Sequence, residues 1–213
     1  MPEHEVGLLA ITLFRGYMAH TAMSSLLAHD AGATAIGILE SENSGPAAVP
    51  VVQIERKDGT AHVFDMSYAL RGISREPSYV ETYKRLWLAG SLITLGDRLK
   101  QQKPPYFDRG PDLELVRHLR NGVGHGNRFE LLHGEPRRPA HFTFSERRLF
   151  VDEGTLTASG NVHTFEVTSS LDGQPVLFDF MGPGDICDLL QTVGTRLIRI
   201  GYANGDPPAP VSP

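Results

Sequence analysis

Apolar residues recur at helical spacing in four stretches of the chain, which predicts four α-helices. Ser78 and Glu81 have capping-box spacing, Pro111 suits a first helical turn, and Gly201 suits a helix end. The expected helices cover about residues 6–29, 78–103, 111–122 and 185–201.

The second of these helices carries two apolar stripes, so it is either a central helix or the seam of a dimer. The aromatic stripe is interpreted as core, because helical spacing alone is what core packing requires. One stripe consists of Leu88, Leu92, Leu95 and Leu99, and the other of Tyr83, Leu86, Trp87, Gly90 and Ile93.

Short alternating runs between the helices predict strands. Residues 51–54 and 61–64 flank Asp58-Gly59, which predicts a β-hairpin, and residues 164–167 and 176–180 flank Asp172-Gly173, which predicts another. Further strands are expected at residues 141–144 and 149–151. The predicted fold is mainly α, an antiparallel helical bundle in one domain over residues 1–203. Two strand-rich insertions are expected at about 33–77 and 134–182, and residues 204–213 form a proline-rich tail expected to be disordered.

Charge is distributed unevenly. The net charge of -5 argues against a protein that coats nucleic acid nonspecifically, yet eight arginines and five acidic residues lie between Arg109 and Arg148. Cys187 is the only cysteine, so neither an intrachain disulfide nor a cysteine zinc cluster is expected. The apolar run from Val6 to Phe14 is too short to span a membrane, and a cytoplasmic location is expected.

Several familiar sites do not fit. The glycines of Gly122-x-Gly124-x-Gly126 follow an amphipathic helical pattern, so they end a helix and do not open a dinucleotide-binding one. No phosphate loop, nucleophile elbow or His-Glu-x-x-His pair is present. The scattered histidines match no usual metal spacing, so no metal or other cofactor is predicted. These are His118, His125, His133 and His141.

Arg120, Asn121 and His125 form the remaining candidate site. RNA can be cut without metal if a base removes the ribose 2'-hydroxyl proton and a cation stabilises the phosphate. Histidine suits the first task because its pKa lies near neutrality, and arginine suits the second because its planar fork matches phosphate oxygens. Asn121 is expected to orient the ring or donate to phosphate.

The spacing sets a condition on this site. Five residues separate Arg120 from His125, about 140° on a straight helix, so one regular helix does not aim both at one phosphate. The glycines can end the helix near His125, or a second subunit can complete the cleft across a two-fold axis.

The segment Leu119–Asn127 resembles the signature of the HEPN superfamily, in which an arginine and a polar residue precede a histidine. The order of the helices also resembles small bacterial HEPN proteins. The resemblance implies a helical bundle, a homodimer, and a metal-independent endoribonuclease that leaves a 2',3'-cyclic phosphate. It also implies a toxin–antitoxin or antiviral-defence role with an antitoxin or defence partner protein. Arg120, Asn121 and His125 match the motif, and Arg117, Asn127 and Arg128 are expected to guide the RNA backbone.

Three alternatives remain. The same residues can bind RNA, a nucleotide or a partner protein without catalysis, or the histidines can hold a hydrolytic metal. The third alternative is structural, with Arg120 on the surface, Asn121 ending the helix and His125 packed against the bundle.

Overall fold

Four α-helices, a short 3-10 helix and two β-hairpins make up the described part of the chain. The computed structural model describes residues 2–27, 34, 37, 51–65, 76, 78–131, 136–149 and 156–204. The chain divides into two compact units: Met1–Arg15 with Trp87–Pro213 form the first, and Gly16–Leu86 form the second. The mainly helical prediction is confirmed, and the single domain stays a prediction.

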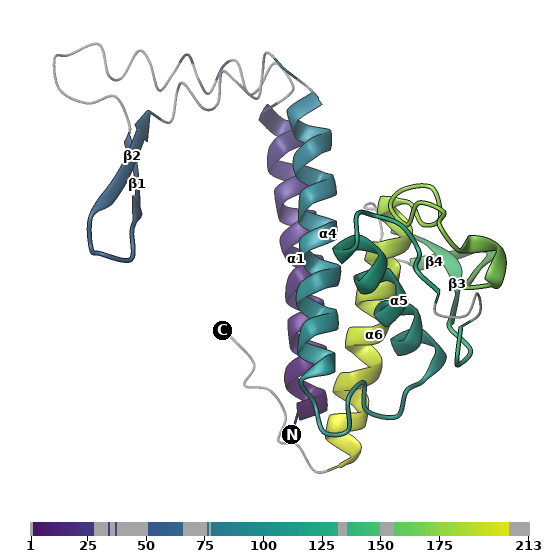
Figure 1. The fold of residues 1–213 in the computed structure, drawn as a ribbon. Coiled ribbons are helices and arrows are strands. Elements are labelled where there is room, and N and C mark those ends of the chain that lie inside the picture. The colour runs from purple at the N-terminus through teal and green to yellow at the C-terminus, as the bar shows by residue number, and fades with distance from the viewer. Residues whose placement is uncertain are drawn as a thin grey trace, which may run out of the picture. The chain divides into compact units, whose positions relative to one another are not determined.

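All four predicted helices are present (Figure 1). They are α1 (Pro2–Leu27), α4 (Ser78–Lys100), α5 (Pro111–Gly124) and α6 (Pro183–Ala203). α4 begins at the expected residue, where the Ser78 hydroxyl donates to Glu76 (2.8 Å) and Glu81 accepts from Lys84 (2.7 Å); the capping box stays a prediction. The predicted continuation of the first helix to residue 29 and the tail 205–213 lie outside the described residues.

The first unit is built on the leucine stripe of α4. Leu88, Leu92, Leu95 and Leu99 are fully buried, as are the leucines on the inner faces of α5 and α6. α6 and the start of α1 approach very closely, because a Cβ on Gly7 would lie 2.8 Å from the carbonyl oxygen of Gly194. Glycines at this crossing let two helix backbones pack without intervening side chains.

The aromatic stripe of α4 is not core, contrary to the prediction. Tyr83, Leu86 and Trp87 are exposed by 49, 62 and 39%. Helical spacing predicted one apolar face correctly, but it could not show how exposed the second face would be, where the Trp87 indole N–H donates to the Leu13 carbonyl (3.2 Å). Within the second unit, Tyr83 makes an edge contact with His20 of α1 (6.3 Å between ring centroids).

The first predicted hairpin is confirmed in the second unit. β1 (Val51–Glu55) pairs antiparallel with β2 (Ala61–Asp65) around Gly59, whose φ of +80° favours glycine. A carboxylate oxygen of Asp58 accepts hydrogen bonds from the backbone N–H and hydroxyl of Thr60, which lowers the pKa of Asp58.

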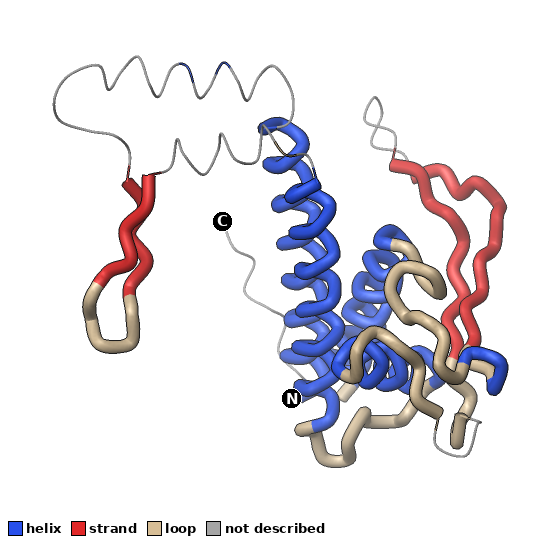
Figure 2. Tube along the Cα trace, turned by 45° about the horizontal axis from the view of Figure 1, so that its top comes forward, coloured by secondary structure: helices blue, strands red, loops and turns tan. Residues whose placement is uncertain are grey.

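The second predicted hairpin is wrong. β3 (His141–Leu149) pairs antiparallel with β4 (Leu156–Glu166), and residues 176–180 form no strand (Figure 2). The Asp172-Gly173 turn instead follows a 3-10 helix, Ser169–Leu171. Val176 is fully buried, and Asn127 holds the backbone of Leu177 through both ends of its amide, so this stretch is packed into the core.

None of the helices in the described ranges is both long and apolar enough to cross a membrane.

Candidate functional site

α5 ends where the glycine-rich segment predicts. His125 occupies the C-cap position with φ -107° and ψ 38°, and its backbone N–H donates to the carbonyls of Asn121 (2.9 Å) and Gly122 (3.2 Å). Gly126 and Asn127 follow with φ of +83° and +61°, and the Arg128 N–H returns to the carbonyl of Gly122 (3.1 Å). His125 therefore leaves the helical path, as the first of the two alternatives requires, whereas convergence of its ring with Arg120 stays a prediction.

Gly122 is the glycine on which this turn depends. A Cβ at this position would collide with the Val176 side chain and lie 3.0 Å from the carbonyl oxygen of Arg128. Any larger residue would push the returning chain away from the helix end. The position of His125 after the helix thus depends on a glycine inside the motif.

Arg120 is anchored against α4. Its stem crosses Gly96, where a Cβ would lie 2.5 Å from the Arg120 Cγ. Its Nε and Nη2 lie 2.8 and 2.5 Å from one Asp97 carboxylate oxygen, and Nη1 donates to the side-chain oxygen of Asn121 (3.3 Å). These contacts fix the direction of the guanidinium, and the Arg120 side chain as a whole is 24% exposed.

His125 is open to solvent. Its side chain is 59% exposed, and Nδ1 lies 3.9 Å from a carboxylate oxygen of Glu130. Within the described residues, no hydrogen bond joins the ring to Arg120. The structure thus places Arg120 and Asn121 in contact and His125 at the same helix end, but separate from them.

The three residues expected to guide RNA have contacts of their own. Arg117 donates from Nε to Glu114 (2.6 Å), and Arg128 donates to the carbonyl of Gly173 (2.7 Å). The Asn127 side-chain amide donates to the carbonyl of Leu177 and accepts from its backbone N–H, so this side chain holds the loop after α5 in place. Their role toward RNA stays a prediction.

A second Arg–His pair lies within α5 and was not recognised in the sequence. Arg117 Nη2 lies 3.0 Å from His118 Nε2, and Glu114, which contacts Arg117, has a side chain only 1% exposed. Burial, with Arg117 beside it, lowers the pKa of His118 to about 4. His118 is therefore neutral at pH 7, with Nε2 accepting from Arg117. In the sequence, the spacing of three residues between Glu114 and Arg117 was the available sign that these two side chains pair on one helix face.

The described residues contain no group of three or more side chains able to hold a metal ion. His118 is buried in α5, whereas His141 is exposed on β3, and His133 lies outside the described part of the chain. Burial also raises the pKa of the Cys187 thiol to about 12, which leaves it protonated and unreactive.

Comparison with protein-family models, curated proteins and solved structures gave no match.

Proposed function

We propose that the chain is a metal-independent endoribonuclease of the HEPN type that acts at the C-terminal end of α5. The observation that carries the proposal is the placement of His125 as an exposed helix cap, five residues beyond a fixed arginine. A solvent-exposed histidine can approach a large substrate, and an anchored arginine can stabilise phosphate with little reorganisation.

In this mechanism His125 takes the proton from a ribose 2'-hydroxyl. The 2'-oxygen then attacks the adjacent phosphorus, the bond from phosphorus to the 5'-oxygen breaks, and that oxygen leaves after gaining a proton. The products are a 2',3'-cyclic phosphate and a 5'-hydroxyl. A histidine ring can serve in turn as base and acid because it titrates near neutrality.

Arg120 stabilises the negative charge on the phosphate. Asp97 occupies the side of the guanidinium formed by Nε and Nη2, and Asn121 accepts from Nη1, so the second N–H of Nη1 is the donor proposed to meet a phosphate oxygen. Asn121 contacts Nη1 and is suited to holding it in place. A homodimer would bring two such helix ends to one cleft, and an antitoxin or defence partner would restrain them.

A non-catalytic module that binds RNA, a nucleotide or a partner protein is the second candidate. The ion pair between Arg120 and Asp97 favours it, together with the separation of Arg120 from the His125 ring. A protein that only binds its ligand needs an anchored cation such as Arg120, but it does not need a general base such as His125 beside that cation.

The test is incubation of the full chain with single-stranded RNA in excess chelator. The proposed enzyme cleaves RNA under these conditions, and His125→Ala and Arg120→Ala do not. The proposed toxin also arrests growth on overexpression, and Arg120→Ala relieves the arrest. Cleavage that requires added metal overturns the mechanism, and tight RNA binding without scission supports the second candidate.

A further inference from the structure

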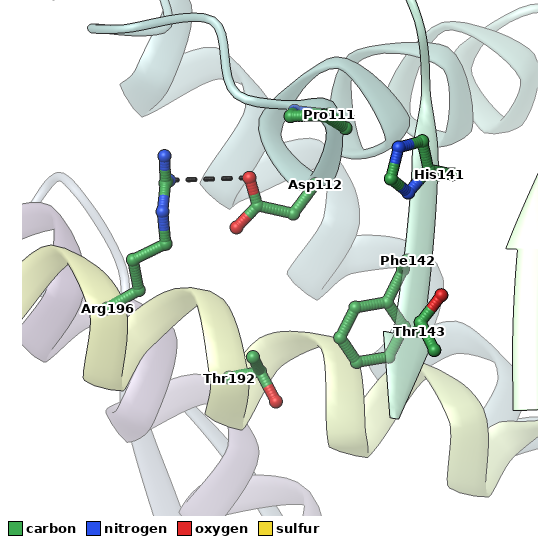
Figure 3. Close-up of a pocket in the computed structure, with 7 residues that line it drawn as sticks. All are labelled: Pro111, Asp112, His141, Phe142, Thr143, Thr192 and Arg196. Carbon is green, nitrogen blue, oxygen red and sulfur yellow. Dashed lines mark ion pairs between the residues drawn. The ribbon is translucent and has the colours of Figure 1, made fainter. Parts of the chain in front are cut away.

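A groove lies between strand β3 and helix α6 in the first unit. Two adjoining cavities of about 320 and 380 Å³ share Thr143, Thr192 and Arg196 as lining residues. Figure 3 shows the Phe142 ring pointing from β3 toward Thr192 of α6, while Arg196 reaches Asp112 at the start of α5. Asp112 and His125 stand at opposite ends of α5, so the groove is separate from the proposed RNA site.

The hydrogen-bond pattern of the hairpin gives the direction of the β3 backbone. The Val167 N–H donates to the carbonyl of Ala140 (2.9 Å), and the register places Thr143 opposite Thr164. Opposed residues of two antiparallel strands alternate between pairs that hydrogen-bond each other through the backbone and pairs that do not. Ala140 and Val167 form a hydrogen-bonded pair, so Thr143 and Thr164, three positions along, form a non-hydrogen-bonded pair. The backbone N–H and C=O of Thr143 therefore point away from β4.

Helix α5 packs against β3, but no strand in the part of the chain that the structure describes pairs with the edge of β3 that faces away from β4. In the described residues, β3 and β4 form a sheet of two strands only. Thr143 lines both cavities, and His141, which shares its outward backbone direction, lines the first. Unpaired backbone groups beside a groove are a template for an added strand.

The charges in the groove disfavour a polyanion. Arg196 is ion-paired with Asp108 and, at 3.3 Å, with Asp112, so its charge is balanced within the protein. Asp188 adds another carboxylate to the lining. Arg199 is exposed and has no ion pair among the described residues, which leaves one cation for a single acidic group.

The geometry points to a docking site for an extended peptide segment of a partner protein. The segment adds a third strand to the free edge of β3, bonds the backbone of Thr143, and directs an acidic side chain toward Arg199. This inference does not depend on RNA cleavage.

The decisive variant is Thr143→Pro in the full chain. Proline removes the outward N–H and blocks an added strand, but it breaks no bond of the β3–β4 ladder. Thr164→Pro is the matched control, because it makes the same change on the far edge of the hairpin. Both variants also lose the hydroxyl contact between Thr143 and Thr164 (3.0 Å), so this loss cancels in the comparison.

The probe is a displayed library of random seven-residue peptides, selected on the wild-type chain. Enriched peptides are expected to share an acidic residue at a fixed position and to bind as synthetic peptides in fluorescence polarisation. Thr143→Pro is expected to weaken binding about tenfold or more, and Thr164→Pro to leave it unchanged. The inference is overturned if no peptide is enriched, or if both proline variants lose binding equally.

Two further arms identify the ligand class. Arg199→Glu is expected to weaken binding of the acidic peptide and to strengthen binding of a peptide that carries lysine in place of the acidic residue. Single-stranded oligouridine is added to the His125→Ala chain while the backbone amide of Thr143 is followed by NMR. A shift of this amide with peptide alone supports the docking site, whereas a shift with oligouridine alone shows a nucleic-acid groove and overturns it.

Discussion

Two Arg–His pairs on the same helix have opposite surroundings. Arg117 and His118 touch each other beside the buried carboxylate of Glu114, and the pKa of His118 is lowered to about 4. Arg120 lies three residues after Arg117, and His125 lies seven residues after His118, at the C-cap of the helix, with its side chain 59% exposed. The comparison teaches that residue type alone does not make a site. A neutral ring that accepts a hydrogen bond inside the fold is structural, and an exposed ring beyond the helix end can meet a substrate.

The largest expected effect separates the two histidines. His125→Ala should lower RNA cleavage by about 10² to 10⁴-fold, the usual contribution of a general base. His118→Asn should leave the rate per folded molecule close to that of the wild type, because His118 is buried away from substrate. Initial rates on one RNA, normalised to folded protein measured by circular dichroism, make the comparison. Equal losses in the two variants would remove the distinction.

The two carboxylates that hold the arginines should differ in their effect on stability. Glu114→Gln is expected to lower the free energy of unfolding by about 2 kcal/mol, because the buried partner of Arg117 loses its charge. Asp97→Asn is expected to cost less than about 1 kcal/mol, since the Asp97 side chain is 41% exposed. Urea denaturation of both variants measures the two losses of unfolding free energy. A larger loss for Asp97→Asn than for Glu114→Gln would contradict the assignment of Glu114 as the more important carboxylate for stability.

Stability should depend on pH through His118. Its pKa is about 4 in the folded chain and about 6.5 when unfolded, so the unfolded state binds the extra proton between these values. The stabilisation from the neutral ring is complete above about pH 6.5 and is lost as pH falls toward 4, on the order of 3 kcal/mol. The free energy of unfolding of His118→Asn, subtracted from that of the wild type at each pH, isolates this group. A difference that does not change with pH would contradict the buried neutral ring.

The smallest expected effect concerns the orientation of Arg120. Asp97→Asn should lower cleavage about tenfold, because the guanidinium loses the partner that fixes its direction. Glu5→Gln is the matched control, since it removes the exposed ion pair of the neighbouring Arg98 (3.3 Å) and leaves the contact between Asp97 and Arg120 intact. A faster Asp97→Asn enzyme would mean that Asp97 competes with phosphate instead of orienting the arginine.

The local features of the fold were predictable from sequence. Pro111 and the glycines after Asn121 set both ends of α5, and Asp58-Gly59 set the first hairpin, because these signals act within a few residues. The second hairpin was mispredicted since Asp172-Gly173 gives only a turn. Which strand pairs with which was decided by distant contacts, including that of Asn127 with Leu177.

The candidate site shows the same division. The sequence singled out Arg120, Asn121 and His125 as candidates. It offered two solutions to their spacing, a helix that ends near His125 or a second subunit, and α5 ends at Gly124. It gave no sign of Asp97, which lies 23 residues before Arg120 and meets it only because α4 and α5 pack through Gly96. It also could not show that the side-chain amide of Asn127 hydrogen-bonds the backbone of Leu177.

The most direct test of the central claim is the chemistry of the cleaved ends. Single-stranded RNA is incubated in excess chelator with the wild-type chain and with His125→Ala, and the product termini are identified by mass spectrometry. The proposed mechanism predicts 2',3'-cyclic phosphate and 5'-hydroxyl ends with the wild type, and neither with His125→Ala. Intact RNA with the wild type, or the same ends with His125→Ala, would contradict it.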